Sequence, residues 1–203
     1  MVIKCLWRVL LLNYQEIDMS DKKPTVDLIF QIGLCVEDME ATLENWKKYF
    51  DIDESTIVKK NTKWAFEHDG WNGHNYNEEY CKFFHKFCRF SLGGLDFEII
   101  EPYDKTPGNP YSDFLVKNGG NGVHHLGVKI GNMPALHMEM KEIGKPRYNY
   151  AEMGPVLSDG TRKGNTFYDL RDELGVILEC CSIVVGPLAD DPRAGNPDDF
   201  VTD

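Results

Sequence analysis

The two halves of the sequence repeat one pattern, and this repeat limits the fold more than any other feature. In the first half, an apolar segment QIGL begins at Gln31 and leads into a helical pattern, and a later segment FEII contains Glu98. In the second half, HLGV begins at His125 and VILE ends at Glu179, at the equivalent places. Each copy has the pattern of a strand, a helix and three strands, and the repeat is too long for a solenoid. The sequence therefore predicts two paired modules that share a cleft.

Local signals predict where the elements of each module begin and end. An apolar, β-rich run covers residues 26–36, and a helical pattern covers 39–50 after an acidic N-cap. The polar and aromatic segment 61–79 is expected to be an inserted loop. In the second copy, a strand is predicted over 123–130 and a helix over 133–143.

The predicted fold class is α+β, with two βαβββ modules that form a shared half-barrel cleft. Whether the modules pair within one chain or across a homodimer is left open. The expected boundaries are an N-terminal extension (1–25), a first module (26–102), a linker (103–121), a second module (122–185) and an acidic flexible tail (186–203). Met19 resembles a second start, so residues 1–18 are expected to be an upstream extension or a loosely held segment.

Charge and cysteine content narrow the class of partner. The 203-residue chain has 22 basic and 33 acidic residues, a net charge of −11, which argues against nucleic acid or an anionic membrane as the partner. Its six cysteines include no C-x-x-C pair, so we expect reduced thiols in a cytoplasmic protein. No segment has the length and apolar character of a membrane span. A small molecule is therefore the expected partner.

Gln31, Glu98, His125 and Glu179 are predicted to bind one divalent metal ion. Both carboxylates lie in apolar strand patterns, where an unpaired charge is costly. The glycine two positions after Gln31 and after His125 leaves room for a ligand on the same strand face. Each residue alone would be interpreted as structural, so the prediction depends on the repeat. The oxygen-rich set suits Zn, Ni, Co, Mn or Mg. His124 is expected to point to the other strand face.

Three basic residues are candidate substrate contacts. The Gly-Gly turn after residue 92 predicts a hairpin that sets Arg89 opposite Glu98. Arg89 is either a structural ion-pair partner or an anchor for a substrate carboxylate. Arg162 and Lys163 are expected in a loop before the last hairpin, where they either meet an anionic tail such as a coenzyme A phosphate or form a solvated turn.

The motifs QIGLCVEDME, LGGLDFEIIEP, GVHHLGV and LGVILE resemble the vicinal oxygen chelate superfamily, which includes glyoxalase I, methylmalonyl-CoA epimerase, extradiol dioxygenases and resistance proteins. The resemblance covers about residues 26–183. Gln31 stands where the dioxygenases need a histidine. The ligand order Gln, Glu, His, Glu resembles animal glyoxalase I, whereas GVHHLGV and the segment after Glu101 look like the epimerase branch.

The resemblance implies an enzyme that removes a proton beside a carbonyl and forms a metal-stabilised enediolate. It implies Glu179 as the catalytic base, with Glu98 as a second base on the opposite face. The expected function is that of an epimerase or isomerase, with an acyl-CoA as one candidate substrate. The alternatives are a glyoxalase-type lyase acting on a thiol hemithioacetal and, in another class, a protein that sequesters a small toxic molecule.

Overall fold

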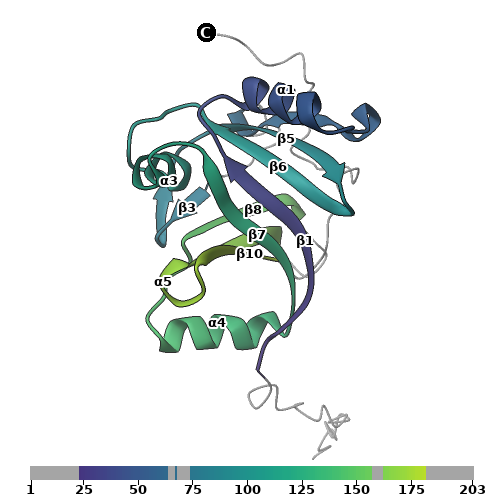
Figure 1. Cartoon of the computed structure of the whole chain (residues 1–203). Coiled ribbons are helices and arrows are strands. Elements are labelled where there is room, and N and C mark those ends of the chain that lie inside the picture. The colour runs from purple at the N-terminus through teal and green to yellow at the C-terminus, as the bar shows by residue number, and fades with distance from the viewer. Residues whose placement is uncertain (1–22, 64–66, 68–73, 157–161, 182–203) are drawn as a thin grey trace, which may run out of the picture.

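The computed structural model describes residues 23–63, 67, 74–156 and 162–181 (Figure 1). The expected extension up to residue 22 and the acidic tail lie outside the described residues. The strands are β1 (Thr25–Cys35), β2 (Val58–Asn61), β3 (His74–Tyr76), β4 (Glu79–Cys81), β5 (His85–Leu92), β6 (Leu95–Pro102), β7 (Gly122–Gly131), β8 (Asn149–Val156), β9 (Arg162–Leu170) and β10 (Val176–Cys181). The helices are α1 (Met39–Tyr49), the 3-10 turn η2 (Glu54–Thr56), α3 (Pro110–Asn118), α4 (Met133–Glu142) and α5 (Arg171–Leu174).

The described strands form one sheet in the order β2-β5-β6-β1-β7-β10-β9-β8-β3-β4. In the first module, β1 pairs in parallel with β6, and in the second module β7 pairs in parallel with β10. The two modules meet where β1 and β7 pair antiparallel along most of their lengths. Both βαβββ modules are therefore present in one chain and share a continuous sheet, which confirms the predicted fold class and resolves the open question of pairing.

Two helices cover the outer face of the sheet, one over each module (Figure 1). Helix α1 begins after Asp38, whose side chain accepts a hydrogen bond from Ala41 N at 2.8 Å, as the sequence predicts. Its Leu43 packs into a cluster with Phe90 and Ile99 of the hairpin β5–β6. Helix α4 packs against β7, β9 and β10 in a separate cluster. Each helix buries its apolar side on its own module.

A third helix, α3, lies inside the segment that the sequence analysis describes only as a linker. Asn109 caps it through side-chain bonds to two backbone amides, Pro110 occupies its first turn, and Gly119 ends it with φ of 72°. Its residues Tyr111 and Phe114 belong to the cluster on the inner face, which includes strand residues of both modules. The linker thus fills part of the space between the modules.

The insert between β2 and β5 includes a hairpin that crosses to the other module. Strands β3 and β4 pair with each other, and β3 also pairs with β8, where Tyr76 lies opposite Asn149. Glu78, in the turn of this hairpin, forms an ion pair with Arg147 at 2.7 Å. The prediction of a loop over 61–79 is therefore wrong for Asn61, for residues 74–76 and for Glu79, which belong to strands.

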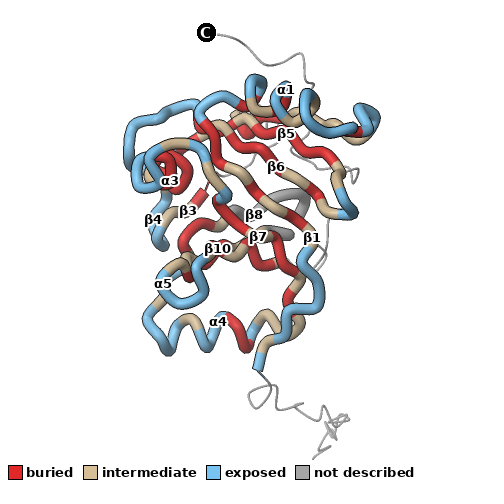
Figure 2. The backbone as a smooth tube through the Cα atoms, in the orientation of Figure 1, coloured by how far each residue is buried: buried red, intermediate tan, exposed pale blue. Residues whose placement is uncertain are grey.

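Burial follows this layered arrangement (Figure 2). Buried residues follow β5, β6 and β7, whereas the outer sides of α1 and α4 are exposed.

The five described cysteines are free thiols, in agreement with the sequence prediction. Within the described part of the chain, no helix has the length and apolarity needed to cross a membrane.

Candidate metal centre

Four adjacent strands each contribute one of the predicted ligands. In the order of the sheet, β6 carries Glu98, β1 carries Gln31, β7 carries His125 and β10 carries Glu179. The repeat places Gln31 and His125 on the central pair β1–β7, and it places Glu98 and Glu179 on the two strands that flank this pair. This juxtaposition follows from the antiparallel pairing of β1 with β7, since each module brings its own parallel neighbour strand to the centre.

The polar atoms converge around the His125 imidazole. Its Nε2 lies 3.2 Å from Gln31 Oε1, 3.3 Å from Glu179 Oε2 and 3.7 Å from Glu98 Oε2. One ligand atom from each of Glu98, His125 and Glu179 lies within 4.8 Å of the others. Ligands about 2.1 Å from a cation lie about 3 Å apart, so this spacing fits one metal ion.

The burial of two neighbouring carboxylates favours a cation between them. His125 is fully buried, and Gln31, Glu98 and Glu179 are 3%, 8% and 7% exposed. Two carboxylates brought together out of water repel each other, and a divalent cation offsets that repulsion. Three oxygen donors and one imidazole nitrogen suit Zn, Ni, Co, Mn or Mg, as the sequence predicts. The residues present therefore fit a divalent metal.

Two glycines make room for ligands of the opposite module. Gly33 lies opposite His125, and a Cβ atom at Gly33 would be 1.9 Å from His125 Cε1. Gly127 lies opposite Gln31, and a Cβ atom there would be 2.7 Å from Gln31 Cβ. The sequence predicts space for a ligand beside these glycines. In the structure, the side chains of Gln31 and His125 occupy that space.

Asp96 supports the centre by binding the candidate ligand Gln31, and the sequence prediction does not include Asp96. Its Oδ2 accepts hydrogen bonds from Gln31 Nε2 at 2.8 Å and from Arg89 Nε at 2.7 Å. Burial raises the pKa of Asp96, and the hydrogen bonds from Arg89 and Gln31 oppose this. Asp96 precedes Glu98 by two residues, so strand alternation could have placed it on the same face. On the opposite side, Asn165 Nδ2 donates to Glu179 Oε1.

The structure confirms the predicted position of one candidate substrate contact and contradicts that of the other two. Arg89 lies opposite Glu98 as predicted, and its guanidinium forms a buried ion pair with Asp96. This contact favours the structural interpretation of Arg89. Arg162 and Lys163 belong to β9 and pair with β8, so the prediction that they lie in a loop is wrong. Their role in substrate binding stays a prediction.

His124 departs from the expected strand geometry. The register between β1 and β7 shifts at this point, so that His125 pairs with Gly33 and Val123 pairs with Leu34. His124 Nδ1 lies 3.0 Å from His125 Nδ1, and its ring centroid lies 5.0 Å from that of Phe114 in α3. Burial and the neighbouring His125 lower the pKa of His124 well below its usual range. The expectation that His124 points away from His125 is therefore wrong.

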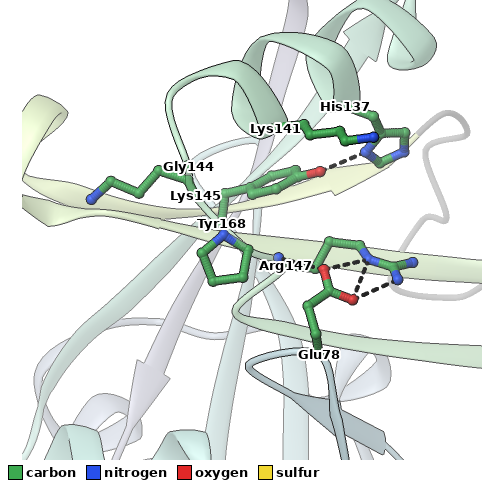
Figure 3. A pocket seen from close by; sticks show the side chains of 8 residues that line it. Glu78, His137, Lys141, Gly144, Lys145, Arg147 and Tyr168 are labelled. Atoms are coloured by element: carbon green, nitrogen blue, oxygen red, sulfur yellow. Dashed lines mark hydrogen bonds and ion pairs between the residues drawn. The ribbon is translucent and has the colours of Figure 1, made fainter.

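A separate pocket of about 530 Å³ lies beside α4 (Figure 3). Tyr168 lines it together with His137 of α4, and the Tyr168 hydroxyl lies 2.6 Å from His137 Nδ1. Tyr168 belongs to the outer-face cluster, whereas its neighbour Phe167 belongs to the inner-face cluster and lies opposite Glu179. The pocket is therefore on the other face of the sheet from the candidate metal centre.

Comparison with known proteins agrees with this architecture. A model of the Glyoxalase/Bleomycin resistance protein/Dioxygenase superfamily matches residues 30–151, a range that includes Gln31, Glu98 and His125. The chain belongs to this superfamily, as the sequence motifs indicate. The matched range ends before Glu179, which the structure brings to the same centre.

Several solved structures are similar to the chain at low sequence identity. A methylmalonyl-CoA epimerase variant of Streptomyces coelicolor, in complex with 2-nitronate-propionyl-CoA, is 20% identical with a TM-score of 0.43 and covers 77% of this chain and 96% of its own. A hypothetical protein from Bacillus halodurans C-125 is 16% identical with a TM-score of 0.44, covering 81% and 98%. A methylmalonyl-CoA epimerase from Mycobacterium tuberculosis is 16% identical with a TM-score of 0.38, covering 76% and 87%. No curated protein sequence matches.

Proposed function

We propose that this protein is a metal-dependent isomerase that moves a proton on a carbon beside a carbonyl group, with epimerisation of an acyl-CoA as the leading reaction. The observation that carries the proposal is the convergence of Glu98 and Glu179 on His125 from opposite sides of the central strand pair. One divalent cation held by these residues and Gln31 would supply positive charge that stabilises the negative charge developing on the substrate carbonyl.

Side chains of the protein are proposed to move the protons of the reaction. Glu179 is the proposed base, because it reaches the centre from β10 and has a carboxylate oxygen 3.3 Å from His125 Nε2. The hydrogen bond from Asn165 to the other oxygen of Glu179 limits the rotation of the carboxylate. A base held in this way can remove a proton from a substrate carbon placed on its side of the centre.

Glu98 is the proposed second acid-base group. Epimerisation requires a proton to leave one face of a carbon and another to arrive on the opposite face. Glu98 reaches the centre from β6, on the other side of the β1–β7 pair from Glu179. Its oxygen, 3.7 Å from His125 Nε2, is the farthest of the three from that nitrogen. Two carboxylates placed in this way support a two-base reaction.

A glyoxalase-type lyase is the second candidate. It is favoured by the ligand set Gln31, Glu98, His125 and Glu179, whose order resembles that of animal glyoxalase I. Both reactions begin with the removal of a proton beside a carbonyl, so the substrate distinguishes them. A sequestering protein is the third candidate, and it would bind a small molecule stoichiometrically without changing it.

Proton exchange with solvent tests the proposal directly. The protein, reconstituted with one divalent metal, is incubated in D₂O with methylmalonyl-CoA or with the hemithioacetal of methylglyoxal and glutathione, and deuterium at the reacting carbon is followed by NMR. We expect exchange and racemisation of the acyl-CoA. Conversion of the hemithioacetal alone would favour the lyase, and absence of exchange with both substrates would contradict either enzyme.

Two variants make the test specific. Glu98→Gln is expected to retain exchange and lose epimerisation, because Glu179 still removes a proton but no group delivers one to the other face. Unchanged epimerisation in this variant would rule out the two-base mechanism. Glu139→Gln, a substitution on α4 at the outer face, is the matched control and should behave as wild type.

A further inference from the structure

We propose that His124 is a positioning residue that accepts the Nδ1 proton of His125 and thereby holds His125 in the tautomer whose Nε2 can bind a metal. The observation that leads to this inference is the separation of 3.0 Å between the two Nδ1 atoms. The inference deepens the proposed function and depends on it, because it assigns the proton arrangement of the candidate metal centre.

The contacts of His125 determine which nitrogen must carry its proton. Its Nε2 faces Gln31, Glu98 and Glu179, so Nε2 is the atom available to a metal. A neutral imidazole that binds a metal through one nitrogen carries its proton on the other. The Nδ1 atom of His125 is then a donor, and it needs an acceptor within hydrogen-bond distance.

His124 provides that acceptor. Two neutral imidazoles whose Nδ1 atoms face each other can form a hydrogen bond only when one Nδ1 carries a proton and the other does not. With the proton on His125 Nδ1, the proton of His124 must be on Nε2. That Nε2 atom is buried, and it has no hydrogen-bond partner among the described residues.

Packing alone does not explain a histidine at position 124. His124 is 1% exposed and lies between aromatic rings, with ring centroids 5.1 Å from Tyr111 and 5.0 Å from Phe114. A buried polar atom without a partner is unfavourable, so an apolar ring would suit this place better if it served only as filling. The hydrogen bond to His125 gives the imidazole a role that an apolar ring lacks.

The backbone is arranged to bring the two rings together. The register shift in the β1–β7 pair gives His125 a partner in Gly33 and Val123 a partner in Leu34, and leaves His124 without a paired residue on β1. An extra residue in one strand changes the direction of its side chain. Gly33 leaves the space in which the His125 ring lies, and α3 covers the His124 ring from the other side.

Metal affinity in two variants tests the inference. His124→Phe keeps a ring and removes the acceptor, whereas His124→Asn places an amide oxygen near the position of Nδ1. The affinity for Zn²⁺ is measured by competition with a chromogenic chelator, and thermal unfolding of the metal-free proteins controls for folding. We expect affinity to fall about 10- to 100-fold in His124→Phe and to be largely recovered in His124→Asn.

The imidazole tautomers give a readout that a purely structural role would not change. In ¹⁵N NMR spectra of the zinc-loaded wild type, we expect the proton on Nδ1 of His125 and on Nε2 of His124. A proton on Nδ1 of His124 would overturn the inference, even if neither variant folds. Wild-type affinity in a folded His124→Phe variant would also overturn it. Failure of the wild type to bind any divalent metal would instead reject the proposed function, and the inference with it.

Discussion

The Gln31 amide connects Asp96 to the candidate metal centre. Its Nε2 donates to Asp96 Oδ2 at 2.8 Å, and its Oε1 lies 3.2 Å from His125 Nε2. Because Asp96 holds the amide nitrogen, the amide oxygen is the atom that faces His125. Arg89 in turn binds Asp96 through a buried ion pair, so the orientation of one candidate ligand depends on two residues that do not reach the centre themselves.

Removal of Asp96 tests this arrangement. Asp96→Ala removes one partner of the buried Arg89–Asp96 ion pair, and such a removal costs about 3–5 kcal/mol of unfolding free energy. The double variant Asp96→Ala/Arg89→Met removes both charges and should recover most of this loss. Both variants should bind Zn²⁺ more weakly than wild type, since Gln31 is no longer held. Urea denaturation measures the stabilities, and equal stability of the single and double variants would contradict the role of the ion pair.

Gly33→Ala is expected to damage the centre without adding or removing any charge. The new Cβ would lie 1.9 Å from His125 Cε1, so the imidazole must move. We expect Zn²⁺ affinity to fall by about 10- to 100-fold or more, measured by chelator competition. Gly131→Ala is the matched control, because its Cβ would meet the Thr25 hydroxyl on an exposed residue that can rotate away. Wild-type affinity in Gly33→Ala would show that the His125 ring is not confined as described.

Metal binding should reverse the sign of the effect that Glu98→Gln has on the free energy of unfolding. Without metal, Glu98→Gln removes a negative charge close to Glu179, and we expect it to raise the free energy of unfolding by roughly 1 kcal/mol. With metal present at about 100 times its dissociation constant, the wild type gains about 2.7 kcal/mol from binding, and the variant gains less because a ligand has been lost. Thermal unfolding with EDTA and with Zn²⁺ makes the comparison. A variant that is less stable under both conditions would argue against repulsion between the carboxylates.

Cysteine reactivity tests the burial of the strands. Burial raises the pKa of Cys88 and of Cys180 to about 12, so at pH 8 both are protonated as well as inaccessible. The thiolate is the reactive form, so both groups should resist iodoacetamide in the native protein and react after unfolding. Cys181, which is partly exposed, is the internal reference and should react faster than Cys88 and Cys180. Mass spectrometry of peptides identifies each site, and equal native rates for Cys88 and Cys181 would contradict the burial.

Local patterns were sufficient to predict most of the elements. The helix after Asp38 and the hairpin that places Arg89 opposite Glu98 follow from a side-chain cap and a Gly-Gly turn, both of which act within a few residues. Strand alternation and the internal repeat predict the candidate ligands on β1, β6, β7 and β10, because they place these residues at equivalent positions. The structure then brings these ligands together.

Long-range contacts explain what local patterns missed. The sequence predicts a loop where the hairpin β3–β4 lies, because its short strands gain their pairing from β8, a strand distant in the sequence. The sequence predicts only a turn-rich linker where helix α3 lies, because the burial of α3 depends on the inner faces of both modules. Asp96 has no equivalent in the repeat, and its importance appears only when Gln31 and Arg89 lie beside it.

Periodicity and repetition are properties of the chain, so they predict the two-module α+β architecture and four candidate ligands without any knowledge of the folded state. The folded structure alone shows that both modules share one sheet within a chain, and that Gly33 and Gly127 make room for the ligands of the opposite module. It also shows that a register shift brings His124 against His125. These features depend on how β1 and β7 align, and alignment between distant strands is set by packing over the whole sheet.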